Sequence, residues 1–211
     1  MSAGNLTAMI ISKRIGVFGL GLTGITTVRF LMNKCRSIFI YDDNLAKIHY
    51  VRNKFPKVII INNLATVIPL LDYAIISPGI PKYFPKRHII FSLCEKYNIQ
   101  ILSDIDILVR IKNKQSISAV TGTNGKSTVM ALLDHLSPFF IISGNIGIPV
   151  LKENIINTTL DSKHIIEISS FQIELLHKKT YFDHIAILDI VPDHIEHHLT
   201  FDNYRNVKKS L

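Results

Sequence analysis

The chain has 211 residues and a net charge of +8; 47% of its residues are hydrophobic and 19% are charged. This composition is too apolar for a disordered chain, and the length is sufficient for two domains. The basic residues are scattered rather than clustered, so we expect no nucleic-acid partner. No apolar run approaches the roughly 18 residues that a membrane span requires. Cys35 and Cys94 lie far apart in the sequence, which is typical of a reducing compartment, so we expect a cytoplasmic protein without a membrane partner.

Short β-branched runs alternate along the chain with segments of helical periodicity. The predicted strands are 15–18, 37–41, 58–61, 73–76, 116–120, 165–168 and 185–188, and the run 139–142 also has the length of a buried strand. The predicted helices include 23–33, 89–97 and 127–136. Because the strands are apolar almost throughout, helices are expected to cover both faces of each sheet. The pattern therefore predicts an α/β fold with parallel sheets.

The first predicted strand runs directly into a glycine-rich turn. Gly19, Gly21 and Gly24 have the spacing G-x-G-x-x-G between a strand and a helix. Such a loop brings backbone amides and a helix N-terminus close to a phosphate group. Asp42 and Asp43 follow the next strand, where carboxylates can bind ribose hydroxyls. The loop alone favours a dinucleotide, while another nucleotide and a purely structural packing role remain open.

A second glycine-rich turn follows the strand 116–120. It reads T-G-T-N-G-K-S-T and departs from the usual P-loop spacing, because Val120 stands where the first glycine of that motif is expected. It still offers glycines that expose amides, a lysine that reaches phosphate oxygens and hydroxyls that ligate Mg²⁺. We predict that this loop binds the phosphates of ATP or GTP. The predicted nucleotide-binding residues are Gly122, Thr123, Asn124, Gly125, Lys126, Ser127 and Thr128.

Polar side chains at two other strand ends can complete a magnesium site. Glu167 lies near the end of the run 165–168, and His194 follows the run 185–188. Because the carboxyl ends of parallel strands face one crevice, both are expected to converge on Lys126. One alternative is that His194 is an ordinary surface histidine. Another is a transition-metal site in the histidine-rich stretch 194–198, which the lack of a nearby cysteine disfavours.

Several motifs, taken together and in order, resemble the Mur ligases, the ATP-dependent amide-forming enzymes of peptidoglycan synthesis. The matching segments are GLGLTG at 19–24, ISPGIP at 76–81, VTGTNGKST at 120–128, GNIG at 144–147, EISSFQIE at 167–174 and DHIEHHLTFDNYRNVK at 193–208. The short form of the phosphate loop is typical of this family. The first two segments favour the D-glutamate-adding members.

The resemblance implies an N-terminal Rossmann-like domain, residues 1–102, and an incomplete P-loop ATP-binding domain, residues 103–211. It also implies that the first loop holds the UDP part of a sugar substrate rather than NAD. The residues implied in substrate binding are Leu22, Thr23, Asp42, Ser77, Pro78, Gly79 and Asn145, the last near the reacting carboxylate. Ser127 and Glu167 are implied as ligands of one Mg²⁺ and His194 as a ligand of a second. Lys208 stands where the family carries a carbamylated, metal-binding lysine.

The reaction implied by the resemblance has two steps. ATP phosphorylates the L-alanyl carboxylate of UDP-N-acetylmuramoyl-L-alanine, and the amine of D-glutamate then attacks the acyl phosphate. Lys126, Asn145, His194 and Lys208 are the implied catalytic residues. Phosphoryl transfer of this kind depends mainly on positioning and on neutralisation of charge.

The sequence also departs from the family. Residues 189–192, Asp-Ile-Val-Pro, replace polar residues before the Asp-His pair, which is expected to loosen the loop. The resemblance extends to Leu211 without the remainder of the central sheet or a third domain. We therefore expect a truncated or split-gene ligase that is inactive alone, with a complementing C-terminal chain as a partner. The alternatives are an NAD-dependent oxidoreductase, a folate polyglutamate synthase and a non-catalytic nucleotide-binding remnant.

Overall fold

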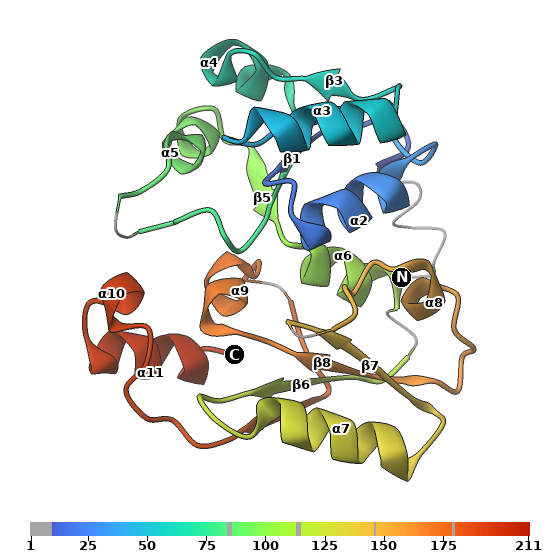
Figure 1. The fold of residues 1–211 in the computed structure, drawn as a ribbon, viewed down its shortest axis with the longest axis vertical. Helices are drawn as coiled ribbons and strands as arrows, with labels where there is room; N and C mark the ends of the chain where they lie inside the picture. Colours follow the sequence, from blue (N-terminus) through green and yellow to red (C-terminus); the bar gives the residue numbers. More distant parts are fainter. Residues whose placement is uncertain (1–9, 84–85, 113–114, 146, 179) are drawn as a thin grey trace.

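A computed structural model describes residues 10–83, 86–112, 115–145, 147–178 and 180–211. It contains two sheets stacked along the longest axis of the molecule, with α6 between them (Figure 1). Every strand pairing within the described residues is parallel. The predicted α/β fold with parallel sheets is confirmed. No helix of the described residues is both long enough and apolar enough to cross a membrane.

The first sheet has the strand order β3-β2-β1-β4-β5. Its strands are β1 (Arg14–Phe18), β2 (Ser37–Tyr41), β3 (Ile59–Ile60), β4 (Tyr73–Ile76) and β5 (Gln100–Leu102). Its helices are α2 (Leu22–Leu31), α3 (Leu45–Lys54), α4 (Leu64–Val67), the 3₁₀ helix Ile68–Leu70 and α5 (Ile89–Lys96). The order of the strands reverses on either side of β1. Ligands of open α/β sheets bind at such a point.

The second sheet has the order β7-β8-β6-β9. Its strands are β6 (Ile117–Thr121), β7 (Phe140–Gly144), β8 (Lys163–Glu167) and β9 (His184–Ile187). The helices that follow them are α7 (Lys126–Leu136), α8 (Glu153–Ile156), α9 (Ser170–Leu175), α10 (Ile195–His198) and α11 (Phe201–Lys209). Figure 1 places α7 on the far side of this sheet from the first one.

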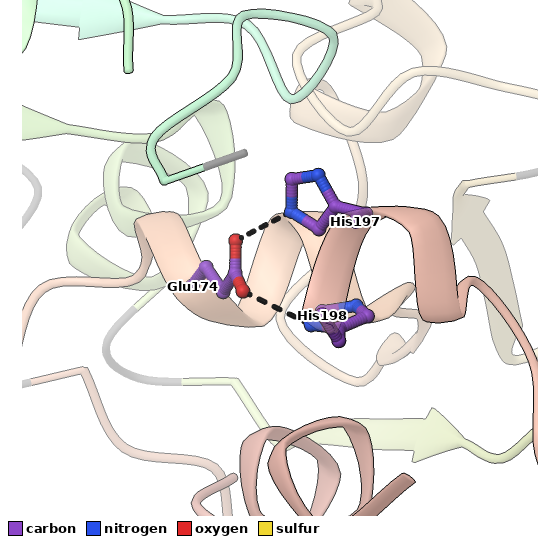
Figure 2. A group of neighbouring side chains, drawn as sticks. All are labelled: Glu174, His197 and His198. Carbon is purple, nitrogen blue, oxygen red and sulfur yellow. Dashed lines mark hydrogen bonds and ion pairs between the residues drawn. The ribbon is translucent and has the colours of Figure 1, made fainter. Parts of the chain in front are cut away.

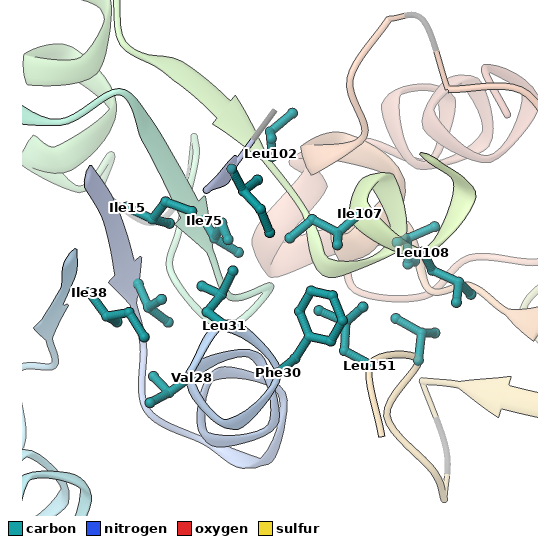
Figure 3. Packing of buried hydrophobic residues seen from close by; sticks show 14 of the residues in the cluster. Ile15, Val28, Phe30, Leu31, Ile38, Ile75, Leu102, Ile107, Leu108 and Leu151 are labelled. Atoms are coloured by element: carbon teal, nitrogen blue, oxygen red, sulfur yellow. The ribbon is translucent and has the colours of Figure 1, made fainter. Parts of the chain in front are cut away.

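Helix α6 (Asp104–Ile111) joins the two sheets and is fixed at its start by a capping box. The side chain of Ser103 accepts from the amide of Asp106, whose carboxylate accepts from the amide of Ser103 at 2.6 Å. The other Asp106 oxygen accepts from the amide of His177 at 3.0 Å, which ties α6 to the segment after α9. A single apolar cluster runs through this junction, with Val28, Leu102, Leu108 and Leu151 among its members (Figure 3). The two sheets therefore share one core, although their division at Ser103 stays a prediction.

Two predictions about strands need correction. β5 was not among the predicted strands, because its three residues are too few to establish a periodicity. All four residues of β9 are exposed, whereas the apolar runs predicted burial on both faces. β9 lies at the edge of its sheet, and the described residues pair only one of its sides. Its Ile185 and Ile187 thus remain open to solvent.

Candidate functional site

The two glycine-rich turns lie at the carboxyl ends of β1 and β6, and the first of them lines a cavity of about 460 Å³ between the two sheets. One wall belongs to the first sheet and contains Gly19, Leu22, Thr23, Asp42, Ser77, Pro78 and Gly79. The opposite wall contains Gly144, Asn145, Gly147, Pro149 and Gln172. All seven residues predicted to bind the UDP-linked substrate therefore line one cavity, together with Gly19 and Gln172.

Close backbone packing gives the first glycine loop its shape. Gly19 has a φ of +86°, which side chains rarely allow. A Cβ atom on Gly24 would lie 1.9 Å from the carbonyl oxygen of Gly19, so only glycine lets α2 begin so near the loop. Ser77 Oγ donates to the same carbonyl oxygen at 2.8 Å, which fixes the end of β4 against the loop.

Asp42 holds the loop as well as lining the cavity. Its Oδ2 accepts from the amide of Leu20 at 2.7 Å, and its Oδ1 accepts from the amide of Asn44 at 2.8 Å. Lys47 Nζ lies 3.5 Å from Oδ2. Both oxygens of the carboxylate thus orient backbone groups, a positioning role that the sequence did not predict.

The second glycine loop presents a helix N-terminus. Gly125 has a φ of +82° and precedes Lys126, the first residue of α7. Asn124, Gly125, Ser127 and Thr128 are exposed residues of this loop. The free amides and the dipole at the start of an α-helix favour an anion at this position.

The segment 189–192 holds this loop through backbone atoms. The amide of Thr123 donates to the carbonyl oxygen of Asp189 at 2.7 Å, and the amide of Val191 donates to Thr123 Oγ1 at 3.2 Å. Thr123 Oγ1 also lies 2.9 Å from the hydroxyl of Tyr204 on α11. These contacts attach the loop to the segment through backbone atoms, and the loosening expected from its side chains stays a prediction.

The ammonium of Lys126 lies against its own loop. Its Nζ donates to the carbonyl oxygens of Gly122 and Thr123, at 2.9 Å each. The side chain is partly buried at the base of the loop. Its predicted contact with phosphate oxygens stays a prediction.

Glu167 ends β8 and brings together three predicted site residues. Its Oε2 lies 3.4 Å from Ser127 Oγ, and its Oε1 lies 3.3 Å from Asn145 Nδ2. The residue is only 2% exposed. The carboxylate of Glu167 and the hydroxyl of Ser127 are oxygen donors of the kind that Mg²⁺ prefers, while Asn145 donates from its amide nitrogen to the carboxylate. The side chains of this group thus fit the cation that the sequence predicted.

Lys208 is buried beside the phosphate loop. Its Nζ lies 3.4 Å from Thr121 Oγ1 and 4.9 Å from the centre of the Tyr204 ring. Burial and, to a smaller extent, the positive charge of Lys126 lower the pKa of Lys208, while the carboxylates of Asp193 and Glu167 raise it; together these effects bring the pKa to about 8. The residue is only 2% exposed, and its electrostatic interaction with Glu167 places both in the same site.

His194 lies at the edge of this group. It precedes α10 with a φ of +50°, and its ring nitrogens lie 3.6 Å from Asp193 and Glu196. Its ring packs on Phe171 and approaches Tyr204, with centroids 5.0 and 6.4 Å apart. Tyr204 approaches the ring of His194 and contacts Thr123, so it connects His194 to the phosphate loop. The sequence did not identify Tyr204 as a site residue. Its position four residues before Lys208, on the same face of a helix, is a signal that could have found it.

Comparison with known proteins identifies the family. Residues 120–211 match the Mur ligase middle domain. A protein of Rickettsia bellii named UDP-N-acetylmuramoylalanine–D-glutamate ligase is 36% identical over 208 residues, which cover 94% of this chain and 43% of that protein. A protein of the same name from Caldicellulosiruptor saccharolyticus is 33% identical, with coverages of 96% and 46%. The predicted resemblance to the Mur ligase family is confirmed. The chain spans less than half of the length of these relatives.

The fold agrees with this family. The solved structure of a UDP-N-acetylmuramate:L-alanyl-gamma-D-glutamyl-meso-diaminopimelate ligase from Neisseria meningitides is similar, with a TM-score of 0.55. The similarity covers 95% of this chain and 67% of that one, at 13% sequence identity. It shows that the two chains share the two-sheet fold described above.

Proposed function

We propose that this chain holds UDP-N-acetylmuramoyl-L-alanine and magnesium ATP for a D-glutamate-adding Mur ligase. The observation that carries the proposal is the cavity of about 460 Å³, whose walls come from both sheets and join the first glycine loop to Asn145. Asn145 in turn contacts Glu167 at the end of β8. A substrate bound by its nucleotide at the first loop thus extends toward the second.

The first glycine loop binds the diphosphate of the sugar nucleotide. Leu22 is 66% exposed at the first turn of α2, and Thr23 follows it on the cavity wall. The free amides of this turn and the helix dipole neutralise an anion there. NAD is a poorer candidate, because the relatives described above are named as ligases of a UDP-linked sugar.

The second glycine loop binds the phosphates of ATP, and ATP supplies the phosphoryl group that activates a carboxylate. The amides at the start of α7 and the ammonium of Lys126 would hold the phosphates of ATP. Ser127 and Glu167 hold Mg²⁺ through oxygen atoms. Asn145, which lies between Glu167 and the cavity, orients the alanyl carboxylate.

Lys208 and His194 form the second metal position of the proposal. Only the neutral amine of a lysine reacts with CO₂, and burial gives Lys208 a pKa of about 8, at which a sizeable neutral fraction exists near pH 7.5. The carbamate so formed is an oxygen ligand beside Glu167. We place this chemistry in the cytoplasm, in keeping with the two free cysteines, Cys35 and Cys94.

Equilibrium titration tests the proposal against the oxidoreductase alternative. The chain is titrated with UDP-N-acetylmuramoyl-L-alanine, with UDP and with NADH, and bound heat and nucleotide fluorescence are recorded. We expect binding of the first two and none of NADH. Binding of NADH without binding of UDP would overturn the proposal in favour of an NAD-dependent enzyme.

A further inference from the structure

A second group of polar side chains lies outside the proposed ATP and substrate sites. Glu174 of α9 faces two adjacent histidines of α10, His197 and His198 (Figure 2). Glu174 Oε2 lies 3.0 Å from His197 Nε2, and Oε1 lies 3.2 Å from His198 Nδ1. The four atoms thus converge on one point between α9 and α10.

Neighbouring histidines on a helix normally point in different directions. These two reach the same carboxylate because His197 uses the distal ring nitrogen and His198 uses the proximal one. Phe171 packs against both imidazoles, with ring centroids 4.3 and 5.8 Å away, and holds their planes. The arrangement is therefore set by the packing of the two helices.

Burial makes this group unlike a surface ion pair. The side chains of Glu174, His197 and His198 are 8%, 10% and 1% exposed. A carboxylate and two imidazoles withdrawn from water need protons or a cation between them. The nearby ammonium of Lys82 donates to the backbone carbonyl of Glu174 rather than to its carboxylate.

We propose that Glu174, His197 and His198 bind one divalent transition-metal ion of the zinc type. Two imidazoles and one carboxylate are the ligand set of many open zinc sites. Tetrahedral bonds of about 2.0–2.1 Å separate neighbouring ligand atoms by roughly 3.3 Å. The two distances from Glu174, 3.0 and 3.2 Å, are close to this value, and the ligand atoms of all three residues lie within 4.8 Å of one another.

A contact behind the ligands supports this assignment. The remaining ring nitrogen of His198, Nε2, lies 3.0 Å from Ser170 Oγ. Metal-binding histidines usually use their second nitrogen in such a bond, which fixes the tautomer and the ring orientation. With Nε2 as the donor to Ser170, the lone pair of His198 Nδ1 faces the point where the ion lies.

The ion has room for an exchangeable fourth ligand. His197 also lines a cavity of about 340 Å³, together with Pro78, Asn145 and Phe171. A metal on His197 is thus reachable from the substrate side of the molecule. It would also fasten α10 to α9, and α11, which carries Tyr204 and Lys208, follows α10 after two residues.

Cobalt(II) is a suitable probe, because a tetrahedral site gives it strong visible absorption. The chain is titrated with Co²⁺ and then with Zn²⁺, in the presence of millimolar Mg²⁺ that saturates any magnesium site. We expect one equivalent of absorbing Co²⁺, displaced by Zn²⁺ and not by Mg²⁺. Glu174→Gln, His197→Gln and His198→Gln each weaken binding at least tenfold, and Ser170→Ala weakens it less.

Matched substitutions separate this site from its neighbours. Glu153→Gln and His49→Gln, both exposed, keep wild-type Co²⁺ binding. His194→Asn also keeps it, although His194 belongs to the proposed magnesium site. Circular dichroism checks that each variant is folded. If Glu174→Gln or His198→Gln unfolds the chain, His197→Gln, at the more exposed of the two histidines, provides the test. An absent Co²⁺ band, or a band lost in His194→Asn and kept in His197→Gln, overturns the proposal.

Discussion

Ser127 Oγ lies 3.4 Å from Glu167 Oε2, which connects the start of α7 to the end of β8. The two residues are far apart in sequence, and their contact depends on the parallel pairing of β6 with β8, in which Val120 is opposite Glu167. The side chain that follows the phosphate loop is thereby placed beside a buried carboxylate. This pair is the expected position of the magnesium ion that accompanies ATP.

Glu167→Gln should remove the magnesium dependence of ATP binding. The amide keeps the size of the side chain but removes the charge that attracts the cation. Loss of a charged contact costs about 1.5–3 kcal/mol, so we expect ATP affinity in Mg²⁺ to fall roughly 10- to 100-fold. Calorimetry with and without Mg²⁺ measures the difference. Glu153→Gln on α8 is the control, and an undiminished effect of Mg²⁺ in Glu167→Gln would contradict the assignment.

Lys126→Met should weaken ATP binding while leaving the UDP-linked substrate bound. The methionine retains much of the aliphatic chain but cannot donate to Gly122, to Thr123 or to a phosphate. We expect ATP affinity to fall by about 10- to 100-fold. The loop also loses two hydrogen bonds, so a thermal melt accompanies the titration. A variant that binds ATP as tightly as the wild type would show that the loop holds phosphate without its lysine.

Gly24→Ala should destabilise the protein, whereas Gly21→Ala should leave its stability close to that of the wild type. Alanine normally stabilises a helix relative to glycine by about 1 kcal/mol. At position 24 the new methyl group would lie 1.9 Å from the carbonyl oxygen of Gly19, and α2 would have to move. At position 21 no heavy atom of the described residues lies within 4 Å of the added methyl group. Urea unfolding should show Gly24→Ala less stable by about 1–3 kcal/mol and Gly21→Ala close to wild type. Equal stability of the two variants would refute this account of the loop.

His164 should make the protein less stable as the pH falls. Burial, helped by the charge of Lys112, lowers the pKa of His164 from 6.5 to about 4 in the folded state. Between these pH values the unfolded chain binds a proton that the folded chain does not. Above pH 6.5 this histidine has no effect, and from pH 6.5 down to 4 the free energy of unfolding falls by an amount of order 2 kcal/mol.

His164→Gln isolates this contribution. The comparison is necessary because burial raises the pKa of Asp104 to about 6, and that group loses stability in the opposite direction, as the pH rises from about 4 to 6. Urea unfolding of both proteins at pH 7.5, 5.5 and 4.5 gives the two slopes. The wild type should lose more stability than the variant on acidification, and parallel curves would contradict the prediction.

The sequence predicted the features that depend on local pattern. The strand ends and glycine spacings placed Gly19 and Gly122 at the carboxyl edges of their sheets, and the family resemblance named the residues that line the cavity. The sequence could not predict that the ammonium of Lys126 lies against its own loop, because its side-chain torsions depend on nearby carbonyl groups that no sequence pattern specifies. The apolar run of β9 did not by itself show that this strand lies at an edge, since such a run looks the same at an edge as in the middle of a sheet.

The Glu174–His197–His198 group shows a second kind of limit. The sequence showed the histidine-rich stretch 194–198, but a transition-metal site was disfavoured there because no cysteine lies nearby. The missing ligand is a carboxylate 23 residues away on another helix, brought near by the packing of α9 against α10 and α11. Such a contact depends on tertiary structure, and no periodicity in a single sequence predicts it.

Simultaneous binding of the two nucleotides tests the central claim most directly. The chain is saturated with MgATP and titrated with UDP-N-acetylmuramoyl-L-alanine, and the titration is repeated in the reverse order and with Lys126→Met and Gly24→Ala. We predict one site for each ligand, without competition, with Lys126→Met weakening only ATP and Gly24→Ala weakening mainly the UDP-linked substrate. Mutual displacement of the two ligands, or a loss of both in Lys126→Met with the fold intact, would contradict the account.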